Sequence, residues 1–226
     1  MFGYFIAAAI LIFLVFIFSR FRPAATQKIT ENLYAVSCGF VNFYAVKTGK
    51  GVALFDTGTN PAAAKRGLLK LGMPPDSVTH IFLTHTDYDH SGGISAFPGA
   101  ERYILKLEEQ MINGETARRG FLRNRRLSNY HTLEDGEIVS VGDSSVKVYA
   151  VPGHTPGSAA YLIDNRFLAS GDLLRVSGKG KILPFLWLMN MNHRQNIESV
   201  KAMQSVINGA EYILTGHTGV KRAKNS

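Results

Sequence analysis

Two histidines and two aspartates lie within six residues, in the segment HTDYDH between His85 and His90. This segment directly follows Val78–Leu83, an apolar run with the length of a buried strand. Gly92 and Gly93 come next and allow the backbone to turn closely. Nitrogen and oxygen ligands must converge within about 2.0–2.2 Å of a metal ion, and such a dense cluster supplies them. The segment therefore predicts a metal site at the end of a strand, with an ordinary polar turn as the alternative.

Three further candidate ligands, His154, Asp172 and His217, lie in glycine-flanked loops after other expected strands. Ligands at the ends of different strands can converge above a sheet, because the strands fix their positions. The other histidines have no acidic or histidine neighbour at ligand spacing, so they are expected to be capping or surface groups. These are His80, His131 and His193.

Short runs rich in β-branched and aromatic residues alternate with amphipathic stretches, which predicts an α/β layered domain. Strands are expected at Leu33–Ser37, Val41–Val46, Val52–Phe55, Val78–Leu83, Glu101–Leu105, Glu137–Val141, Val146–Val151, Ala159–Ile163, Phe167–Ala169 and Tyr212–Leu214. Helices are expected at Pro61–Leu71, Leu107–Ile112 and Arg194–Ile207.

Residues 2–18 form an apolar run with no charge and no proline. As a helix the run would be about 25 Å long, close to the ~30 Å of a bilayer core. No basic residue precedes it and no small-x-small cleavage site follows, so an anchor is favoured over a cleaved signal peptide. The predicted division is an anchor at 1–22, a linker at 23–28 and the folded domain with the candidate metal site at 29–226.

The basic residues Arg20, Arg22 and Lys28 all follow the apolar run. The positive-inside rule then predicts a single-pass protein of the cell membrane with its domain on the cytoplasmic side. Cys38 is the single cysteine, so no intrachain disulfide can form.

Much of the net charge of +8 comes from five arginines between Arg118 and Arg126. A basic cluster of this kind usually forms a solvated surface. Contact with anionic lipid head groups or with an acidic substrate is the alternative.

At these residues the sequence resembles the metallo-β-lactamase superfamily, and within it the glyoxalase II-like hydrolases. The resemblance extends from about Lys28 to His217. Its motifs are Phe55-Asp56-Thr57-Gly58, Thr84–Gly93, Pro152–Ser158 with Tyr161, Ser170-Gly171-Asp172 and Thr215-Gly216-His217.

The resemblance implies a four-layer αββα sandwich with two metal ions at one edge, here preceded by the predicted transmembrane helix. It also implies a role for each matching residue. His85, Asp87 and His154 would hold the first ion, Asp89, His90 and His217 the second, Asp172 would bridge them, and Asp56 would orient a ligand histidine.

The sequence departs from the usual family pattern H-x-H-x-D-H at Asp87. Flavodiiron proteins carry glutamate there, and bacterial DNA-uptake channel proteins carry H-x-D-x-D-H. The chain is too short for an added flavodoxin-like domain and shows no polytopic channel. Two divalent ions are expected, zinc first, with manganese or iron as alternatives because an oxygen ligand replaces an imidazole.

The implied activity is hydrolysis of a small-molecule ester, thioester, lactone or amide by a hydroxide held between two ions, with Asp89 passing a proton to the leaving group. One alternative is a phosphodiesterase or nuclease, in which the Arg118–Arg126 cluster guides a polyanion; nucleic acid is the less favoured partner. Another is a non-catalytic metal-binding or redox protein. The apolar segment Ile182–Met191 can be a pocket wall, core or membrane contact.

Overall fold

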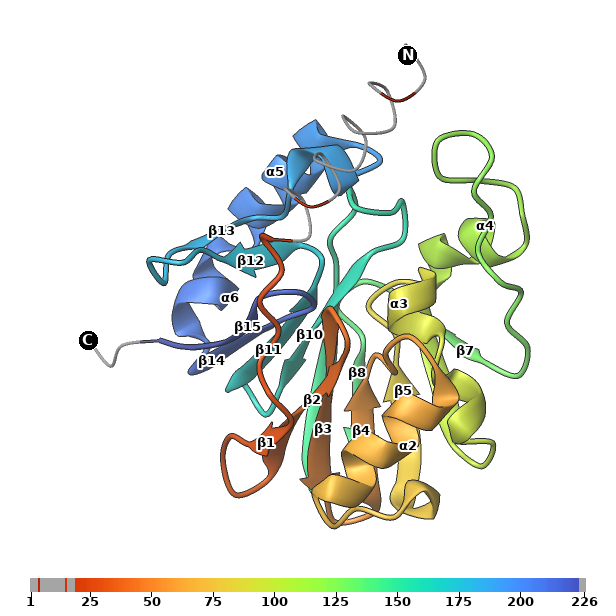
Figure 1. Cartoon of the computed structure of the whole chain (residues 1–226), viewed down its shortest axis with the longest axis vertical. Coiled ribbons are helices and arrows are strands. Elements are labelled where there is room, and N and C mark those ends of the chain that lie inside the picture. Colours follow the sequence, from red (N-terminus) through yellow and green to blue (C-terminus); the bar gives the residue numbers. More distant parts are fainter. Residues whose placement is uncertain (1–3, 5–14, 16–18, 224–226) are drawn as a thin grey trace.

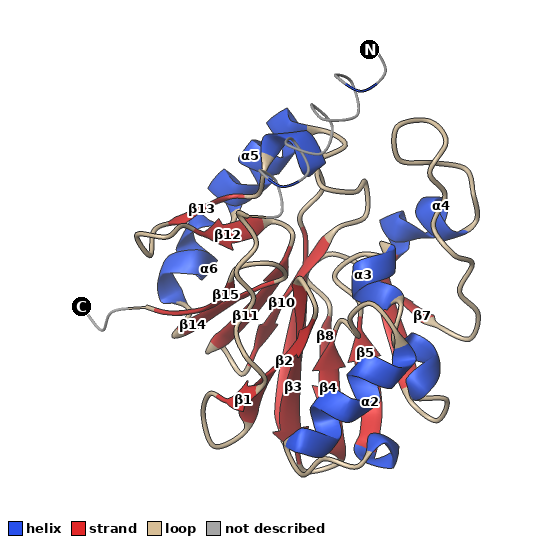
Figure 2. Cartoon of the chain, in the orientation of Figure 1, coloured by secondary structure: helices blue, strands red, loops and turns tan. Residues whose placement is uncertain are grey.

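The computed structural model describes residues 4, 15 and 19–223. Two large sheets pack face to face, and helices cover their outer faces (Figures 1 and 2). The expected α/β sandwich is thus confirmed. The prediction of a transmembrane helix concerns residues that, except for 4 and 15, lie outside the described part. Within the described part, no helix is long and apolar enough to cross a bilayer.

The first sheet has the strand order β1-β2-β3-β4-β5-β6-β7. Its strands are β1 (Gln27–Lys28), β2 (Leu33–Cys38), β3 (Val41–Thr48), β4 (Gly51–Phe55), β5 (Val78–Phe82), β6 (Glu101–Leu105) and β7 (His131–Leu133). Helix α2 (Pro61–Lys70) begins where Asn60 Oδ1 accepts from the Ala63 amide at 2.9 Å. The helix packs closely on β2, because a Cβ at Gly67 would lie 2.1 Å from a methyl carbon of Val36.

The second sheet has the order β15-β14-β11-β10-β9-β8. Its strands are β8 (Ile138–Val141), β9 (Ser144–Ala150), β10 (Ala159–Ile163), β11 (Phe167–Gly171), β14 (Tyr212–Thr215) and β15 (Gly219–Arg222). The remaining elements are α3 (Tyr88–Ser91), α4 (Glu109–Ile112), α5 (His193–Ala202), α6 (Gln204–Gly209), the pair β12 (Leu174–Val176) and β13 (Ile182–Pro184), and 3-10 turns at Pro75–Ser77, Ile94–Ala96, Lys106–Glu108 and Trp187–Met189.

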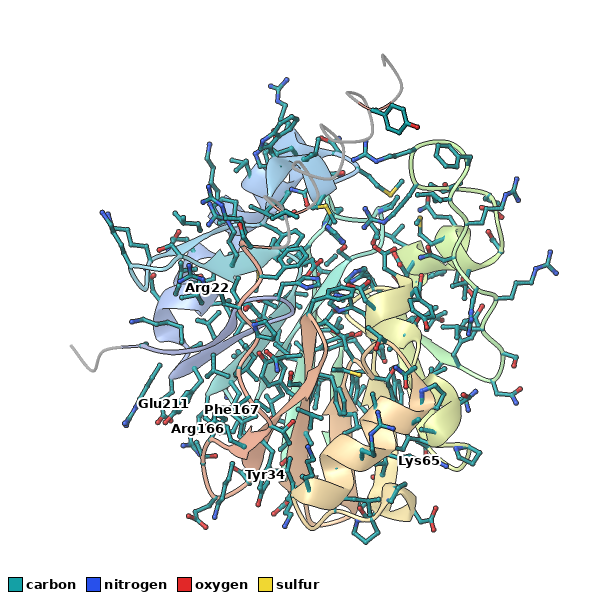
Figure 3. The ribbon with its side chains drawn as sticks, viewed as in Figure 1. Arg22, Tyr34, Lys65, Arg166, Phe167 and Glu211 are labelled. Atoms are coloured by element: carbon teal, nitrogen blue, oxygen red, sulfur yellow. The ribbon has the colours of Figure 1, made fainter. Side chains whose placement is uncertain are left out.

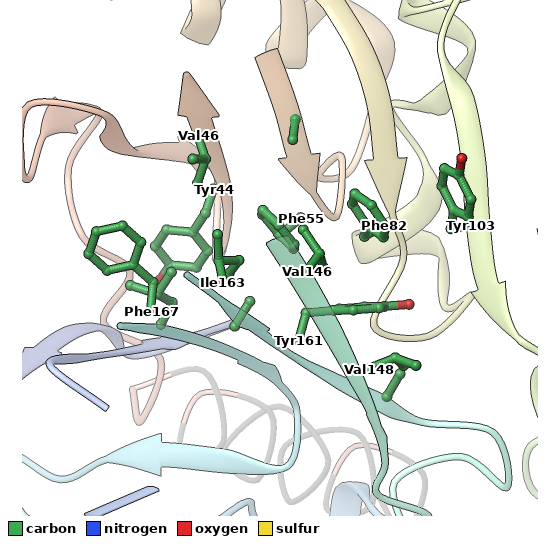
Figure 4. Packing of buried hydrophobic residues seen from close by; sticks show 14 of the residues in the cluster. Tyr44, Val46, Phe55, Phe82, Tyr103, Val146, Val148, Tyr161, Ile163 and Phe167 are labelled. Atoms are coloured by element: carbon green, nitrogen blue, oxygen red, sulfur yellow. The ribbon is translucent and has the colours of Figure 1, made fainter. Parts of the chain in front are cut away.

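Three apolar clusters separate the layers. The central one joins the inner faces of both sheets, and Phe55, Phe82 and Tyr161 point toward one another within it (Figure 4). A second cluster lies between α2 and the first sheet, and a third between the second sheet and α6. This gives the helix–sheet–sheet–helix order that the family resemblance implies.

Parallel strand pairs bring the loops of the site to one edge of the sandwich. Strands β4 and β5 are parallel, so their carboxyl ends carry Asp56 and the segment from Thr84 to the same place. Strands β11 and β14 are also parallel, and their ends carry Asp172 and His217.

The structure differs from the expected elements mainly in short strands. Strands β1, β7, β12, β13 and β15 were not expected, because runs of two to four partly exposed residues give no clear alternation. The single helix expected at Arg194–Ile207 is divided into α5 and α6 at Met203, where the backbone ψ of 1° leaves the α-helical region.

Tyr161 connects the sheets through a buried hydrogen bond, since its hydroxyl donates to the Leu83 carbonyl at 2.9 Å. We expect Tyr161→Phe to lower the free energy of unfolding by about 1–2 kcal/mol, because a buried carbonyl loses its donor. Urea denaturation measures this. Tyr34→Phe is the control, because that hydroxyl donates only to the nearby Glu31 carbonyl, at the lower edge of the molecule (Figure 3). Equal losses in both variants would contradict the expectation.

Candidate metal centre

The structure brings His85, Asp87 and His154 together, with their ligand atoms within 4.8 Å of one another. Asp87 Oδ2 lies 3.5 Å from His85 Nε2 and 3.4 Å from His154 Nε2. His85 and Asp87 follow β5, whereas His154 lies in the loop between β9 and β10. These are the residues predicted for the first ion.

Asp89, His90 and His217 form a second group with the same closeness of ligand atoms. Asp89 Oδ2 lies 3.3 Å from His217 Nε2 and 3.7 Å from His90 Nε2. These are the residues predicted for the second ion. The structure places both groups; ligation itself stays a prediction.

Asp172 lies between the two groups, at the end of β11. Its Oδ2 is 3.3 Å from both His154 Nε2 and His217 Nε2, and its Oδ1 is 3.6 Å from His90 Nε2. Burial opposes ionisation of this carboxyl, but the surrounding histidines outweigh it and lower the pKa of Asp172. The position is that of the predicted bridging ligand.

The donor atoms of this cluster fit a metal ion. Among the described residues, His85 Nε2, His90 Nε2 and Asp172 Oδ1 are buried and accept or donate no hydrogen bond. Such atoms are costly to bury unless something binds them. The backbone also leaves room for these groups, because a Cβ at Gly216 would lie 2.6 Å from Asp172 Oδ1 and 2.7 Å from His90 Cε1.

Asp56 holds His90 and the start of the ligand loop in place. Its Oδ2 lies 2.8 Å from His90 Nδ1, and its Oδ1 accepts from the Thr84 amide at 2.8 Å. Burial lowers the pKa of His90, but the attraction of Asp56, followed by the other acids, raises it to about 9. With Nδ1 engaged, Nε2 of His90 faces the centre, as predicted for a carboxylate that orients a ligand histidine.

The other three histidines are oriented in the same way. His217 Nδ1 donates to the Phe40 carbonyl at 2.9 Å, and His154 Nδ1 lies 3.2 Å from Asn190 Oδ1. His85 Nδ1 lies 3.1 Å from Thr84 Oγ1. Each Nε2 is therefore directed into the cluster.

Glu108 is a buried supporting residue that sequence reasoning did not identify. Its Oε1 accepts from the amide and the hydroxyl of Thr86, and its Oε2 accepts from the Thr155 hydroxyl, all at 2.7 Å. Glu108 thus joins the loops of His85 and His154. Its position among expected helix residues gave no local signal of this role, because its partners come from distant loops.

Arg118 is the second residue that was missed. Its Nη2 lies 2.6 Å from Asp87 Oδ2 and 2.6 Å from His154 Nε2. Its side chain is only 17% exposed, so the expectation of a solvated surface is wrong for Arg118. The expectation holds for the other members of the cluster, which are exposed: Arg119, Arg123, Arg125 and Arg126.

A cavity of about 410 Å³ opens beside the cluster. Its apolar lining is Phe21, Phe40, Leu122, Leu188 and Met189, and its polar lining includes Asp87, Asp89, Arg118, Arg119, His154, Asp172 and His217. The segment Ile182–Met191 thus supplies part of the wall. It also supplies core, because Phe185 is buried, with its ring centroid 5.3 Å from that of His154.

The remaining histidines take no part in these groups of the described chain, as expected. His80 is buried and stacks with Tyr103 at a centroid distance of 6.0 Å, so it is a packing residue rather than a surface group. His131 is exposed, and His193 begins α5.

The family model described as the metallo-beta-lactamase superfamily matches residues 36–217. The chain therefore belongs to this superfamily.

Its relatives include two proteins named hydroxyacylglutathione hydrolase. The one from Gloeobacter violaceus is 32% identical over 162 residues, covering 68% of this chain and 56% of the relative. The one from Maricaulis maris is 32% identical over 110 residues, covering 47% of this chain and 38% of the relative. The match thus spans about half the length of the first relative and less than half of the second.

Solved structures show the same fold. A subclass B3 metallo-beta-lactamase with an active-site glutamic acid has a TM-score of 0.69 at 20% identity, over 90% of this chain and 85% of that one. A metallo-beta-lactamase family protein from Thermus thermophilus has a TM-score of 0.68 at 24% identity, over 86% of this chain and 76% of that one.

The Asp56–His90 contact yields a test of the metal centre. Asp56→Asn keeps a side chain that tolerates the local φ of 65° but removes the charge behind His90. We expect metal affinity to fall by about 10–100-fold, as for other partners of ligand histidines. Competition with a chromophoric chelator measures this, and the exposed Asp76→Asn is the control. Unchanged affinity in Asp56→Asn would contradict the expectation.

Proposed function

We propose that this chain is a metal-dependent hydrolase that cleaves an ester, thioester, lactone or amide bond of a small molecule. The observation that carries the proposal is the convergence of four histidines and three aspartates at one end of an apolar-walled cavity. The names of the relatives, hydroxyacylglutathione hydrolases, support an acyl substrate.

Asp89, His90, His217 and Asp172 would hold one divalent ion, with zinc as the first candidate. When bound, such an ion lowers the pKa of a water molecule to about 7 and supplies hydroxide at neutral pH. The predicted first ion, at His85, Asp87 and His154, does not fit equally well. The guanidinium of Arg118 already contacts two of these three side chains.

Asp89 is the proposed proton carrier to the leaving group. Its side chain is 21% exposed and lines the cavity, whereas the side chain of Asp172 is 4% exposed. A carboxylate that borders both the ligand cluster and the cavity can accept a proton on one side and release it on the other.

The cavity supports an acyl substrate over a polyanion. Its lining includes five apolar side chains, and of the arginine cluster only Arg118 and Arg119 line it. Arg118 is already paired with Asp87, so its guanidinium is less available to bind a phosphodiester. The other members of the Arg118–Arg126 cluster that was expected to guide a phosphodiester, Arg123, Arg125 and Arg126, are not among the residues that line the cavity.

We also propose that residues 2–18 anchor the protein in the cell membrane, with the domain on the cytoplasmic side. The charge pattern of the sequence supports the topology. The chain that follows the anchor leads directly to the site, because the Arg22 amide donates to the His217 carbonyl at 2.7 Å and the Phe21 ring stacks on His217 at 4.3 Å. A substrate that enters this cavity would therefore meet Phe21, a few residues after the proposed anchor in the sequence.

We expect His90→Ala and His217→Ala each to lower kcat/KM by about 100-fold or more while the thermal unfolding curve is retained. The assay uses chromogenic esters, thioesters, lactones, amides and phosphodiesters with defined metals. His131→Ala is the matched control, since that histidine is exposed and outside the cluster. Hydrolysis of phosphodiesters alone, falling steeply with salt, would instead indicate a nuclease or phosphodiesterase. Bound metal without any turnover would indicate the non-catalytic alternative.

The topology has a separate test. Protease added to intact spheroplasts is expected to leave the domain uncleaved, and permeabilised spheroplasts provide the control in which it is cut. Digestion in intact spheroplasts would reverse the orientation. A mature form that begins after residue 23 would establish a signal peptide instead of an anchor.

A further inference from the structure

The guanidinium of Arg118 lies among the donors expected to hold the first ion. Its Nη2 contacts Asp87 Oδ2 and His154 Nε2, each at 2.6 Å. These two acceptor atoms are only 3.4 Å apart. A single cationic nitrogen thus lies against two of the three side chains that would otherwise bind a metal.

The surrounding chain holds Arg118 in this place. Its Nη1 donates to the Met189 carbonyl at 2.8 Å, and its Nη2 lies 3.3 Å from the His154 carbonyl. Its backbone is fixed as well, because Arg118 and Leu122 exchange two backbone hydrogen bonds across a tight turn, at 2.8 and 2.9 Å. Moving the guanidinium away would break bonds on both of its sides.

Asp87 is engaged by the same loop through its second oxygen. Asn124 Nδ2 donates to Asp87 Oδ1 at 3.1 Å and to Thr86 Oγ1 at 2.9 Å. Both carboxylate oxygens of Asp87 therefore have donors from residues 118–124. This contact gives a physical reason for Asp87, which stands where the usual family pattern has histidine. A carboxylate forms an ion pair with a guanidinium, whereas an imidazole at the same position would not.

The charges of the cluster agree with this arrangement. Asp87, Asp89 and Asp172 together carry three negative charges when ionised. One divalent ion and Arg118 supply three positive charges, whereas two divalent ions and Arg118 would supply five. A second ion beside the guanidinium would also experience direct repulsion in a site where water screens it little.

We propose that the guanidinium of Arg118 takes the place of the predicted first ion, the one expected at His85, Asp87 and His154. The protein then binds one divalent ion tightly, at Asp89, His90, His217 and Asp172, and a second ion only by displacing Arg118. The inference goes beyond the proposed function, since it concerns metal content and holds whichever bond is cleaved. A substrate oxygen in the cavity would meet a guanidinium at this position instead of a metal ion.

The test is the zinc stoichiometry of the full chain, measured by isothermal titration and by elemental analysis after dialysis. We expect one tight equivalent in the wild type. Arg118→Met keeps the length of the side chain and removes its charge. We expect this variant to bind a second zinc ion about 10-fold more tightly than the wild type, or tighter still. Arg119→Ala is the matched control, because this neighbour donates to the Leu188 carbonyl and contacts no donor of the cluster. It should bind zinc as the wild type does.

Two equivalents of equal affinity in the wild type would overturn the proposal, as would a second equivalent that Arg118→Met leaves unchanged. The wild-type stoichiometry decides the question even if Arg118→Met fails to fold. The readout also separates the two proposals. Failure of hydrolysis with one tight ion would refute the proposed function alone, and two tight ions with hydrolysis would refute only the role of Arg118.

Discussion

The buried carboxylate of Asp56 is the contact on which the geometry of the site depends. It accepts from the Thr84 amide and contacts His90 Nδ1, so it connects the end of β4 to the end of β5 and to a candidate ligand histidine. Asp56 is only 3% exposed and has a φ of 65°. A buried charge and a left-handed backbone each cost free energy, and they persist where surrounding contacts compensate for them. The two-sheet core below supplies the rigid strands from which these contacts are made.

Glu108 repeats this arrangement on the other side of the cluster, where it joins Thr86 and Thr155. Each of these threonines directly follows a candidate ligand histidine in the sequence, His85 and His154. The site therefore contains two kinds of acidic residue. Asp56 and Glu108 are buried and hold the loops in place. Asp87, Asp89 and Asp172 line the cavity and supply negative charge for cations. Burial raises the pKa of Glu108, and the hydrogen bonds from the two threonines oppose that rise.

The sequence predicted the parts of the molecule that depend on local pattern. The longer strands alternate or form apolar runs, and the candidate ligands all follow such strands, so their convergence at one sheet edge was foreseeable. Arg118 and Glu108 were not, because a run of arginines indicates a surface, and a glutamate in the first turn of a helix is usually a solvated residue that interacts with the helix dipole. Their roles come from contacts with loops 22 to 71 residues away, which leave no periodic signal. Edge strands such as β7 and β15 were missed for a related reason: their pairing depends on a neighbour, not on their own composition.

The turn from Arg118 to Leu122 also links the charges of the candidate metal centre to the shape of the cavity. Arg118 and Arg119 donate to the carbonyls of Met189 and Leu188, and the side chains of these two residues form part of the apolar wall. The same guanidinium that contacts Asp87 thus holds the wall in place. A change that moves Arg118 would therefore also act on this wall. Both of these hydrogen bonds come from charged donors, which form stronger hydrogen bonds than neutral groups do. If Arg118 takes the place of the first ion, substrate selection and metal content both depend on its contact with Asp87.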